Sequence, residues 1–239
     1  MPLLGTAAML LSFDVVEEAV AEHDDWHTHE HLPERLSIPG FLRGTRWVAV
    51  QGQPRYLVLY EVEDLDTLAS EAYLERLNHP TPWTARMMSH YRAMRRGLCS
   101  VVASAGLGLG HLGLLIRFHA DEAMAPRLDE WLRRDVLAAL AGLPGIGSVH
   151  LLRGALAAPS TSEQRLRGSD AGVDRALLVT GYRQDALAGL AGSDLSDRRL
   201  ADHGAAGVVS AIYRTDYTLV ARELGPGGRS ALQRTRMGP

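Results

Sequence analysis

The chain contains no lysine, although it has 25 basic residues, all of them arginine. Without a lysine amine the protein cannot form a Schiff base, and it has no Walker lysine for a nucleotide phosphate. Pyridoxal enzymes, lysine aldolases and P-loop enzymes are therefore excluded. Cysteine is nearly absent as well. Because Cys99 is the only cysteine, no internal disulfide can form. A single cysteine is typical of a reducing compartment, so we expect a cytoplasmic location and an inert, buried thiol.

Long apolar runs and a strong charge imbalance are also missing. No run approaches the roughly 18 residues of a membrane helix. The net charge of −3 gives no reason to expect nucleic acid or a membrane surface as a partner. The N-terminal MPLLGTAAMLLSF lacks a basic segment and runs into acidic residues, so we interpret it as a first strand rather than a signal peptide.

The chain does contain a weak internal repeat. Phe13 and Phe118 close apolar runs, Trp26 and Trp131 lie in the charged segments that follow, and Pro-Gly pairs at 39–40 and 144–145 end these segments. All three features recur at the same spacing. We therefore divide the chain into a first unit at 1–106, a second, degenerate unit at 107–223 and a disordered tail at 224–239.

Hydrophobic periodicity predicts the order β-α-β-β-α-β in both units. In the first unit we expect strands at 6–13, 41–50, 55–62 and 97–104, and helices at 17–36, which Pro33 could break, and at 66–93, interrupted by a loop at 78–82. In the second unit we expect strands at 111–119, 148–154, 175–182 and 211–221, and helices at 122–142 and 185–203. Residues 155–173 are an insertion rich in Ala, Ser, Gly and Pro, which predicts a loop. The Gly-rich hinge at 105–110 lacks the strand-to-helix context of a dinucleotide-binding motif.

Each such unit is ferredoxin-like, a four-stranded antiparallel sheet with helices on one face. The bare sheet face must be buried, and two units in one chain can bury theirs against each other. The predicted fold class is therefore α+β, with two tandem ferredoxin-like units forming an intramolecular α/β barrel.

The layout W-(x)4-H-(x)7-PGF, formed by Trp26, His31 and residues 39–41, and the segment NHPTPWT at 78–84 resemble the dimeric α/β-barrel superfamily. The sequence is most similar to EthD-like members and to uncharacterised bacterial members with a fused double unit. The resemblance implies the fold more strongly than a function, because members include polyketide cyclases, lactone isomerases, small monooxygenases and haem-handling proteins. In that superfamily the histidine that corresponds to His31 often borders the pocket between sheet and helices.

Four of the ten histidines fall within residues 23–31. On a helix, His23, His27 and His31 share one face, and Arg35 reaches the same region from the next turn. Glu30 and Glu34 form a pair on an adjoining face. A histidine beside a carboxylate suits proton transfer at an enolisable carbon, and an arginine can hold the resulting oxyanion.

Other interpretations of this cluster remain open. The simplest is an outer helix face on which His and Glu only contact water. The run HTHEH fits the H-x-x-E-H pattern of zinc peptidases. We reject that interpretation because Pro33 follows closely and no distant carboxylate lies around 100–115. A weaker metal site formed by His27, His31 and one carboxylate stays an alternative, but we predict no metal.

Aromatic residues are concentrated in the first unit. Most are expected in the core, but some can line an aromatic-friendly pocket. Trp83 is the favoured pocket residue, because it follows a Pro-rich loop at a helix start. Tyr60 and Trp26 are further candidates, and Arg46 is a candidate anion anchor.

The second unit has lost the cluster. At the equivalent positions His27 becomes Leu132, Glu30 becomes Asp135, His31 becomes Val136 and Arg35 becomes Leu140. Acid–base chemistry cannot use that set, so we expect a single site that belongs to the first unit. The second unit then closes the barrel, as a second subunit does in the dimeric relatives.

The leading hypothesis is a cofactor-independent acid/base enzyme of isomerase, cyclase or dehydratase type that acts on a small aromatic or carbonyl-bearing molecule. His31 is the candidate acid/base, with His27 beside it. Glu30 or Glu34 orients it or balances its charge, Arg35 anchors an oxyanion, and Trp83 and Tyr60 line the pocket. The alternative is a non-catalytic small-molecule-binding or structural barrel. A third option is haem handling with His27 or His31 as axial ligand. Pairing of the fused barrel into a homodimer is left open.

Overall fold

The structure is a computed structural model, which describes residues 3–157 and 160–225. Its strands are β1 (Ala7–Val15), β2 (Phe41–Gln51), β3 (Tyr56–Val62), β4 (Tyr91–Gly106), β5 (Leu112–Ala120), β6 (Ile146–Leu156), β7 (Ala171–Gly172), β8 (Arg175–Gly181) and β9 (Ala205–Val220). Eight of these strands close into an antiparallel barrel in the order β1-β3-β2-β9-β5-β8-β6-β4, because β4 pairs back to β1. The short β7 runs parallel to β4 at its edge.

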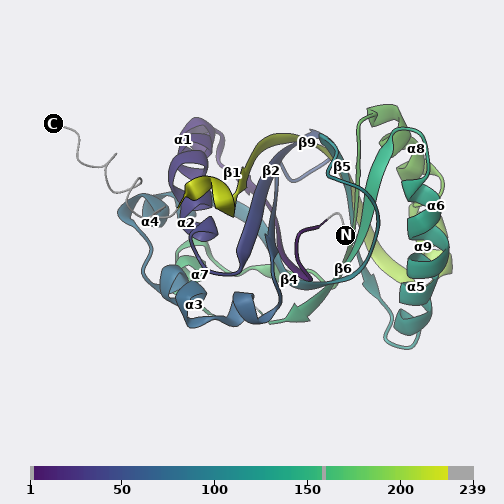
Figure 1. The fold of residues 1–239 in the computed structure, drawn as a ribbon, viewed down its shortest axis with the longest axis horizontal. Helices are drawn as coiled ribbons and strands as arrows, with labels where there is room; N and C mark the ends of the chain where they lie inside the picture. The colour runs from purple at the N-terminus through teal and green to yellow at the C-terminus, as the bar shows by residue number, and fades with distance from the viewer. Residues whose placement is uncertain (1–2, 158–159, 226–239) are drawn as a thin grey trace.

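Helices cover the barrel on two opposite sides (Figure 1). On the first unit they are α1 (Val20–Trp26), α2 (Leu32–Leu36), α3 (Glu71–Asn78) and α4 (Pro82–Met88), with 3-10 turns η1 (Glu17–Ala19) and η3 (Asp66–Ala69) and the π-helical turn η2 (His27–His31). On the second unit they are α5 (Ala125–Trp131), α6 (Leu137–Ala141), α8 (Gln184–Gly192) and α9 (Asp197–Asp202), with the π-helical turn η4 (Leu132–Val136). The 3-10 turn η5 (Ala221–Leu224) ends the described chain, and α7 (Ser162–Arg167) is discussed below.

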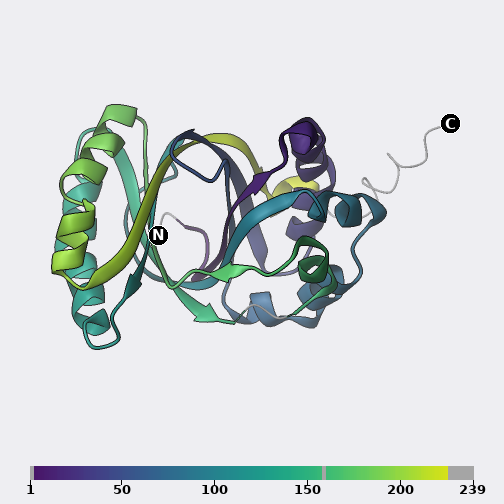
Figure 2. The same cartoon turned by 180° about the vertical axis from the view of Figure 1, so that it is seen from behind.

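The strand order confirms the predicted α+β fold. The first unit contributes β4-β1-β3-β2 and the second β9-β5-β8-β6, which is the same ferredoxin-like order twice. The two units join through the pairs β2–β9 and β4–β6. Viewed from behind, the same two helical layers enclose the barrel (Figure 2).

The barrel interior is filled by side chains. Leu10, Trp47, Leu57, Leu115 and Tyr213 belong to one apolar cluster there, and each is at most 1% exposed. Two further clusters lie between the sheet and the helices of each unit. Because the lumen is packed, as in other small barrels, a ligand site must lie elsewhere.

Two strands are longer than predicted. β4 begins at Tyr91, where a helix was expected to continue to residue 93, and β9 begins at Ala205 instead of 211. Each has 16 residues because it pairs with a strand of its own unit and then with a strand of the other. Cross-unit pairing is non-local, so the periodicity of one segment does not reveal it.

The first helix continues past Pro33. Pro33 lies in the first turn of α2, immediately after the π-helical residues His27–His31. The backbone hydrogen-bond pattern changes there, so the missing N–H of proline is tolerated.

The prediction of a loop at 155–173 is wrong in part. Residues Ser162–Arg167 form α7, whose N-cap is Thr161, with a side chain that accepts a hydrogen bond from the backbone N–H of Gln164. This helix belongs to the second unit in sequence, yet it packs against α3 and α4 of the first. The insertion is therefore a structural part of the other unit.

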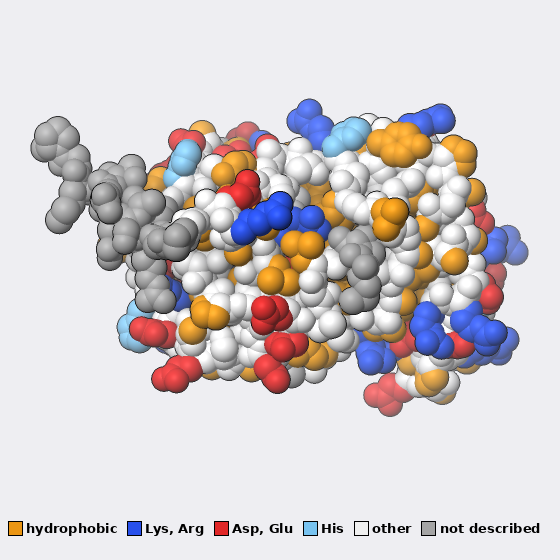
Figure 3. Space-filling model, in the orientation of Figure 1, with side chains coloured by type: hydrophobic (Ala, Val, Ile, Leu, Met, Phe, Trp, Pro, Cys, Tyr) orange, Lys and Arg blue, Asp and Glu red, His pale blue; other side chains and the backbone are white. Residues whose placement is uncertain are grey.

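Residues 226–239 of the predicted tail lie outside the described residues. Within the described part, every helix is too short or too polar to cross a membrane. On the face shown in Figure 3, acidic, basic and apolar side chains are interspersed, without a broad field of one charge sign.

Candidate active site

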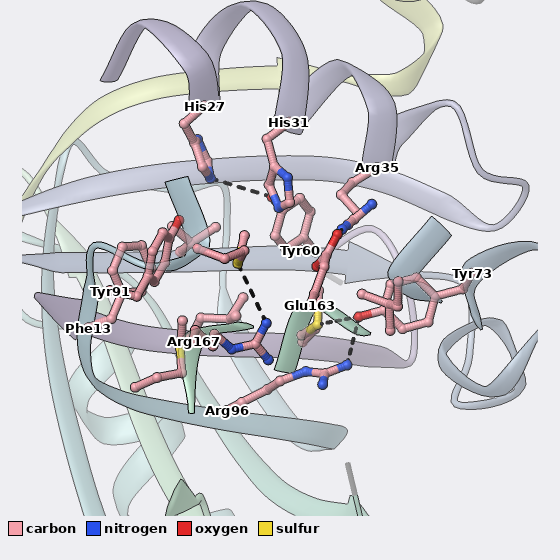
Figure 4. A pocket seen from close by; sticks show the side chains of 16 residues that line it. Phe13, His27, His31, Arg35, Tyr60, Tyr73, Tyr91, Arg96, Glu163 and Arg167 are labelled. Atoms are coloured by element: carbon pink, nitrogen blue, oxygen red, sulfur yellow. Dashed lines mark hydrogen bonds and ion pairs between the residues drawn. The ribbon is translucent and has the colours of Figure 1, made fainter. Parts of the chain in front are cut away.

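The candidate site is a cavity between the sheet of the first unit and its helices (Figure 4). Strands β1, β3 and β4 form its floor, the turn η2 and helix α2 form one wall, and α3, α4 and α7 close it. Its volume of about 30 Å³ has room for about two water molecules. The polar side chains that line it are His27, His31, Arg35, Tyr60, Tyr73, Tyr91, Arg96, Glu163 and Arg167.

The three histidines lie on one face of the helix, as the spacing predicts. The ring centroids of His23 and His27 are 5.5 Å apart, and those of His27 and His31 are 5.6 Å apart. All three side chains are buried, so the outer-surface interpretation is wrong for them, whereas His29 is exposed. His23 is enclosed by partners, since its Nε2 lies 3.2 Å from the Tyr91 hydroxyl and its Nδ1 lies 3.1 Å from Asp24.

His27 and His31 are held neutral. Burial is the main cause that lowers the pKa of both rings well below the ordinary histidine value, and nearby positive groups, Arg35 among them, lower it further. The Nδ1 atom of each ring has no hydrogen-bond partner among the described residues. The Tyr60 hydroxyl lies 3.5 Å from Nε2 of His27, and burial raises the pKa of Tyr60 above its usual range. The site therefore presents neutral imidazoles beside a protonated phenol.

Arg35 is compensated by two carboxylates. Its guanidinium forms a close ion pair with Glu163 of α7 and another, at 3.4 Å, with Glu34. Burial acts to lower the pKa of Arg35, but Glu163 and Glu34 outweigh it and raise the pKa. Burial also raises the pKa of Glu34. The charge that was predicted to anchor an oxyanion is thus already paired.

Two further arginines lie across the cavity from the histidines. Arg167 of α7 donates to Asp170 at 2.6 and 2.9 Å. Arg96 of β4 donates to the Tyr73 hydroxyl at 2.9 Å, and that hydroxyl donates in turn to the sulfur of Met9 at 3.0 Å. Figure 4 shows both guanidinium groups directed toward the cavity from below.

The cavity brings together four of the eight predicted site residues, namely His27, His31, Arg35 and Tyr60. Glu30 lies outside it and accepts hydrogen bonds from Thr81 and, at 3.4 Å, Thr84. Trp26 packs behind His31 with ring centroids 4.4 Å apart.

Two other predicted ligand-binding residues also lie away from the cavity. Arg46 pairs with Asp216 at 2.7 Å on the side of β9. Trp83 was predicted to wall the pocket, but its indole N–H donates to Glu22 at 2.9 Å at the surface. The Pro-rich loop before Trp83 marks the start of α4, whose N-cap is Thr81, and not a pocket.

The sequence reasoning missed the contribution of the second unit. Glu163 and Arg167 line the cavity from α7, so the prediction that the site belongs to the first unit alone is wrong. A local signal was present, because Thr161 is a good N-cap and Glu163 and Arg167 are spaced as neighbours on one helix face. Arg96, which lines the cavity from β4, was also not among the predicted site residues.

The second unit has no equivalent set of polar side chains. Its π-helical turn η4 lies at the position equivalent to η2, and the residues corresponding to His27, His31 and Arg35 are Leu132, Val136 and Leu140. All three are buried in the apolar cluster of that unit. The loss of polar residues inferred from the sequence therefore corresponds to a filled core.

Within residues 3–157 and 160–225, no three or more His, Cys, Asp or Glu side chains are grouped so that they could hold a metal ion. Haem, which the resemblance raises, does not fit the closed cavity. The unpartnered imidazole nitrogens suit an iron ligand, but about 30 Å³ cannot hold a tetrapyrrole.

No family model and no curated protein matches this sequence. Solved structures do match its fold. An anthrone oxidase-like protein is 13% identical, with a TM-score of 0.67 over 92% of this chain and 96% of that chain. A putative monooxygenase from Fusobacterium nucleatum is 7% identical, with a TM-score of 0.58 over 91% and 96%. Another from Lactobacillus acidophilus is 9% identical, with a TM-score of 0.55 over 90% and 96%.

At such identities these matches show the fold alone. The shared fold is a closed antiparallel barrel with helices outside it, and here one chain supplies both ferredoxin-like units.

Proposed function

We propose that the protein is a cofactor-independent acid/base enzyme that moves a proton on a small carbonyl-bearing or aromatic molecule. The observation that carries this proposal is the pair of buried, neutral imidazoles, each with an unpartnered Nδ1, on the wall of a small cavity. A neutral imidazole is a proton acceptor, and a site that excludes water strengthens every charge interaction within it.

His31 is the proposed base. No group of the described part is hydrogen-bonded to its Nδ1, and in the tautomer that carries the proton on Nε2 this nitrogen can accept a proton from a substrate C–H. Because its pKa is lowered, it is a weak base and requires a carbon acid that is already activated, such as the methylene of an aromatic ketone or a 1,3-dicarbonyl. Tyr60, whose pKa is raised, stays protonated and donates to the enolate oxygen, with His27 holding its hydroxyl.

Return of the proton to a different atom completes an isomerisation, and loss of a leaving group completes a dehydration. One of the similar structures is an anthrone oxidase-like protein, and anthrone, an enolisable aromatic ketone, belongs to the proposed class of substrate. A particular affinity with EthD-like members of the superfamily is part of this proposal.

The non-catalytic alternative predicts ordinary values for the cluster histidines in an NMR titration, whereas the acid/base enzyme predicts lowered values for His27 and His31. Haem handling requires the cavity of about 30 Å³ to open further than the proposed substrates do, and the absence of a Soret shift on titration with haemin would argue against it. Any ligand larger than about two waters requires the lining side chains to move, among them Glu163 and Arg167 of α7.

Hydrogen–deuterium exchange at carbon tests the proposal directly. Anthrone and a series of cyclic 1,3-diketones are incubated with the protein in D2O under nitrogen, and exchange above the buffer rate is followed by mass spectrometry. We expect His31→Ala to slow exchange by about 100-fold or more. His29→Ala, which changes an exposed ring of the same segment, serves as the control. Full activity in His31→Ala would eliminate His31 as the base, and a wild-type protein without exchange on the whole series would favour the non-catalytic alternative.

A further inference from the structure

The side chain of Arg96 lines two neighbouring pockets. It contributes to the cavity below the histidines and to an adjoining groove of about 460 Å³, which lies beside β4, β6 and the α7–β7 segment. Gln164 and Asp170 of that segment line the same groove. Arg96 itself is only 3% exposed. A volume of this size is within the ordinary range of small-molecule sites.

The guanidinium of Arg96 is incompletely bonded. Its Nη2 donates to Tyr73, but Nη1 has no hydrogen-bond partner among the described residues. Asp170 is 3.9 Å from Nη1, and its oxygens accept hydrogen bonds from Arg167 at 2.6 and 2.9 Å. Arg35, by contrast, has two carboxylate partners of its own. A buried cation with a free N–H is costly unless something else completes its hydrogen bonds.

A second unpartnered group lines the same groove. The Oε1 atom of Gln164 is buried and accepts no hydrogen bond from the described residues. One side chain on β4 with a free donor and one on α7 with a free acceptor therefore line the same groove. This pair matches a ligand that carries an anionic oxygen and, nearby, an N–H or O–H.

We propose that Arg96 is the carboxylate-binding residue of the candidate site and that its ligand is a small organic monocarboxylate. This inference rests on the proposed function and narrows its substrate class. An arginine N–H pairs strongly with a carboxylate oxygen. The carboxylate of Glu163 lines the cavity and that of Asp170 lines the groove. Their negative charges disfavour the binding of a doubly charged phosphate. Arg96 lines both the groove and the cavity of the histidines, so a carboxylate bound there lies next to the candidate site.

The test is a calorimetric titration with benzoate, using benzamide as the uncharged probe and inorganic phosphate as the dianion. We expect wild-type protein to bind benzoate better than either. Arg96→Met should weaken benzoate binding by about 10- to 100-fold, because one charge-assisted hydrogen bond is lost. Arg95→Met is the matched control, because Arg95 is the exposed neighbour in the same strand and does not line the cavity or the groove.

Arg96→Lys controls for a folding defect, because it keeps the buried positive charge but lacks the planar guanidinium. We expect this variant to bind benzoate with intermediate affinity. Equal benzoate affinity in wild type and in Arg96→Met or Arg96→Lys overturns the inference, and so does a wild-type protein that fails to bind benzoate up to about 10 mM. Failure of the proposed function is distinguishable. Arg96-dependent benzoate binding without any carbon exchange would uphold the inference and reject the acid/base enzyme.

Discussion

At the scale of single residues, burial decides the chemistry of side chains that look alike in the sequence. His29 is exposed, whereas His27 and His31, two residues away on either side, are buried and neutral. Arg35 is neutralised by two carboxylates, whereas Arg96 keeps an unpartnered nitrogen. The same residue types therefore serve as surface charge, structural ion pair or candidate site, according to their surroundings.

The second unit supplies a natural replacement for the two histidines. His27→Leu with His31→Val copies Leu132 and Val136, which pack in the core there. We expect this double variant to fold and to lose carbon exchange by about 100-fold or more. His29→Leu is the control, and exchange at the control rate in the double variant would refute the roles of both rings.

The same variant should change the pH dependence of stability. Burial lowers the pKa of both rings in the folded protein, so below about pH 6.5 the unfolded chain binds more protons than the folded one. Stability is therefore full above that pH and is lost as the pH falls toward the folded pKa values. We expect the melting temperature of wild type to fall more steeply than that of the double variant between pH 7 and 5. Parallel curves in a thermal-melt series would contradict the burial argument.

At the scale of elements, the helix that carries the histidines and the inserted helix α7 matter most. A π-helical turn often marks a functional site. Here it occurs at equivalent positions in both units, including the unit with a filled core. The turn is therefore a feature of this helix in the fold, and the polar residues that it carries in the first unit make the site. Helix α7 then adds Glu163 and Arg167 from the other half of the chain.

Breaking the contact between α7 and α2 should be costly. Glu163→Ala leaves the buried charge of Arg35 with Glu34 alone, and removal of one partner of a buried pair typically costs about 3–5 kcal/mol. Denaturant unfolding should show a loss of this order. Adding Arg35→Leu, which copies Leu140, should recover much of it. Asp185→Ala, which breaks an exposed ion pair with Arg183, should change stability little. Additive losses from Glu163→Ala and Arg35→Leu would show that the two side chains are not coupled.

At the scale of the whole molecule, the two units depend on each other. Each sheet turns an apolar face into the barrel, and β2–β9 and β4–β6 supply the hydrogen bonds that would otherwise be missing at the sheet edges.

One end of the barrel also holds a buried polar group. His150 bonds to Ser148 and Ser104 there, and burial followed by the charge of Arg43 lowers its pKa to about 4.

The first unit should therefore not form a stable monomer by itself. A chain of residues 1–106 exposes the barrel face of Leu10, Leu57 and Leu59, leaves two strand edges unpaired and lacks α7. We expect it to self-associate, either as a dimer that closes a barrel or as aggregates, in light scattering coupled to size-exclusion chromatography. A monomer with a dispersed NMR spectrum would contradict this expectation. The full chain serves as the control, and its pairing into a homodimer stays a prediction that the same experiment can test.

The sequence by itself determined the two-unit architecture, the order of the elements and the histidine face of the first helix. These features are local, because strand and helix periods and a repeated spacing can be read within one segment. The same reading located the loss of polar residues in the second unit, where Leu132, Val136 and Leu140 replace the cluster.

Only the tertiary structure decided how the site is completed. The docking of α7 on α3 and α4 joins residues that are far apart in the chain, and no pattern within residues 155–173 specifies that contact. Burial and pairing likewise depend on neighbours from several elements. For this reason Trp83 lies outside the cavity, Arg35 is already paired, and Arg96 is the arginine with a free N–H in the cavity wall.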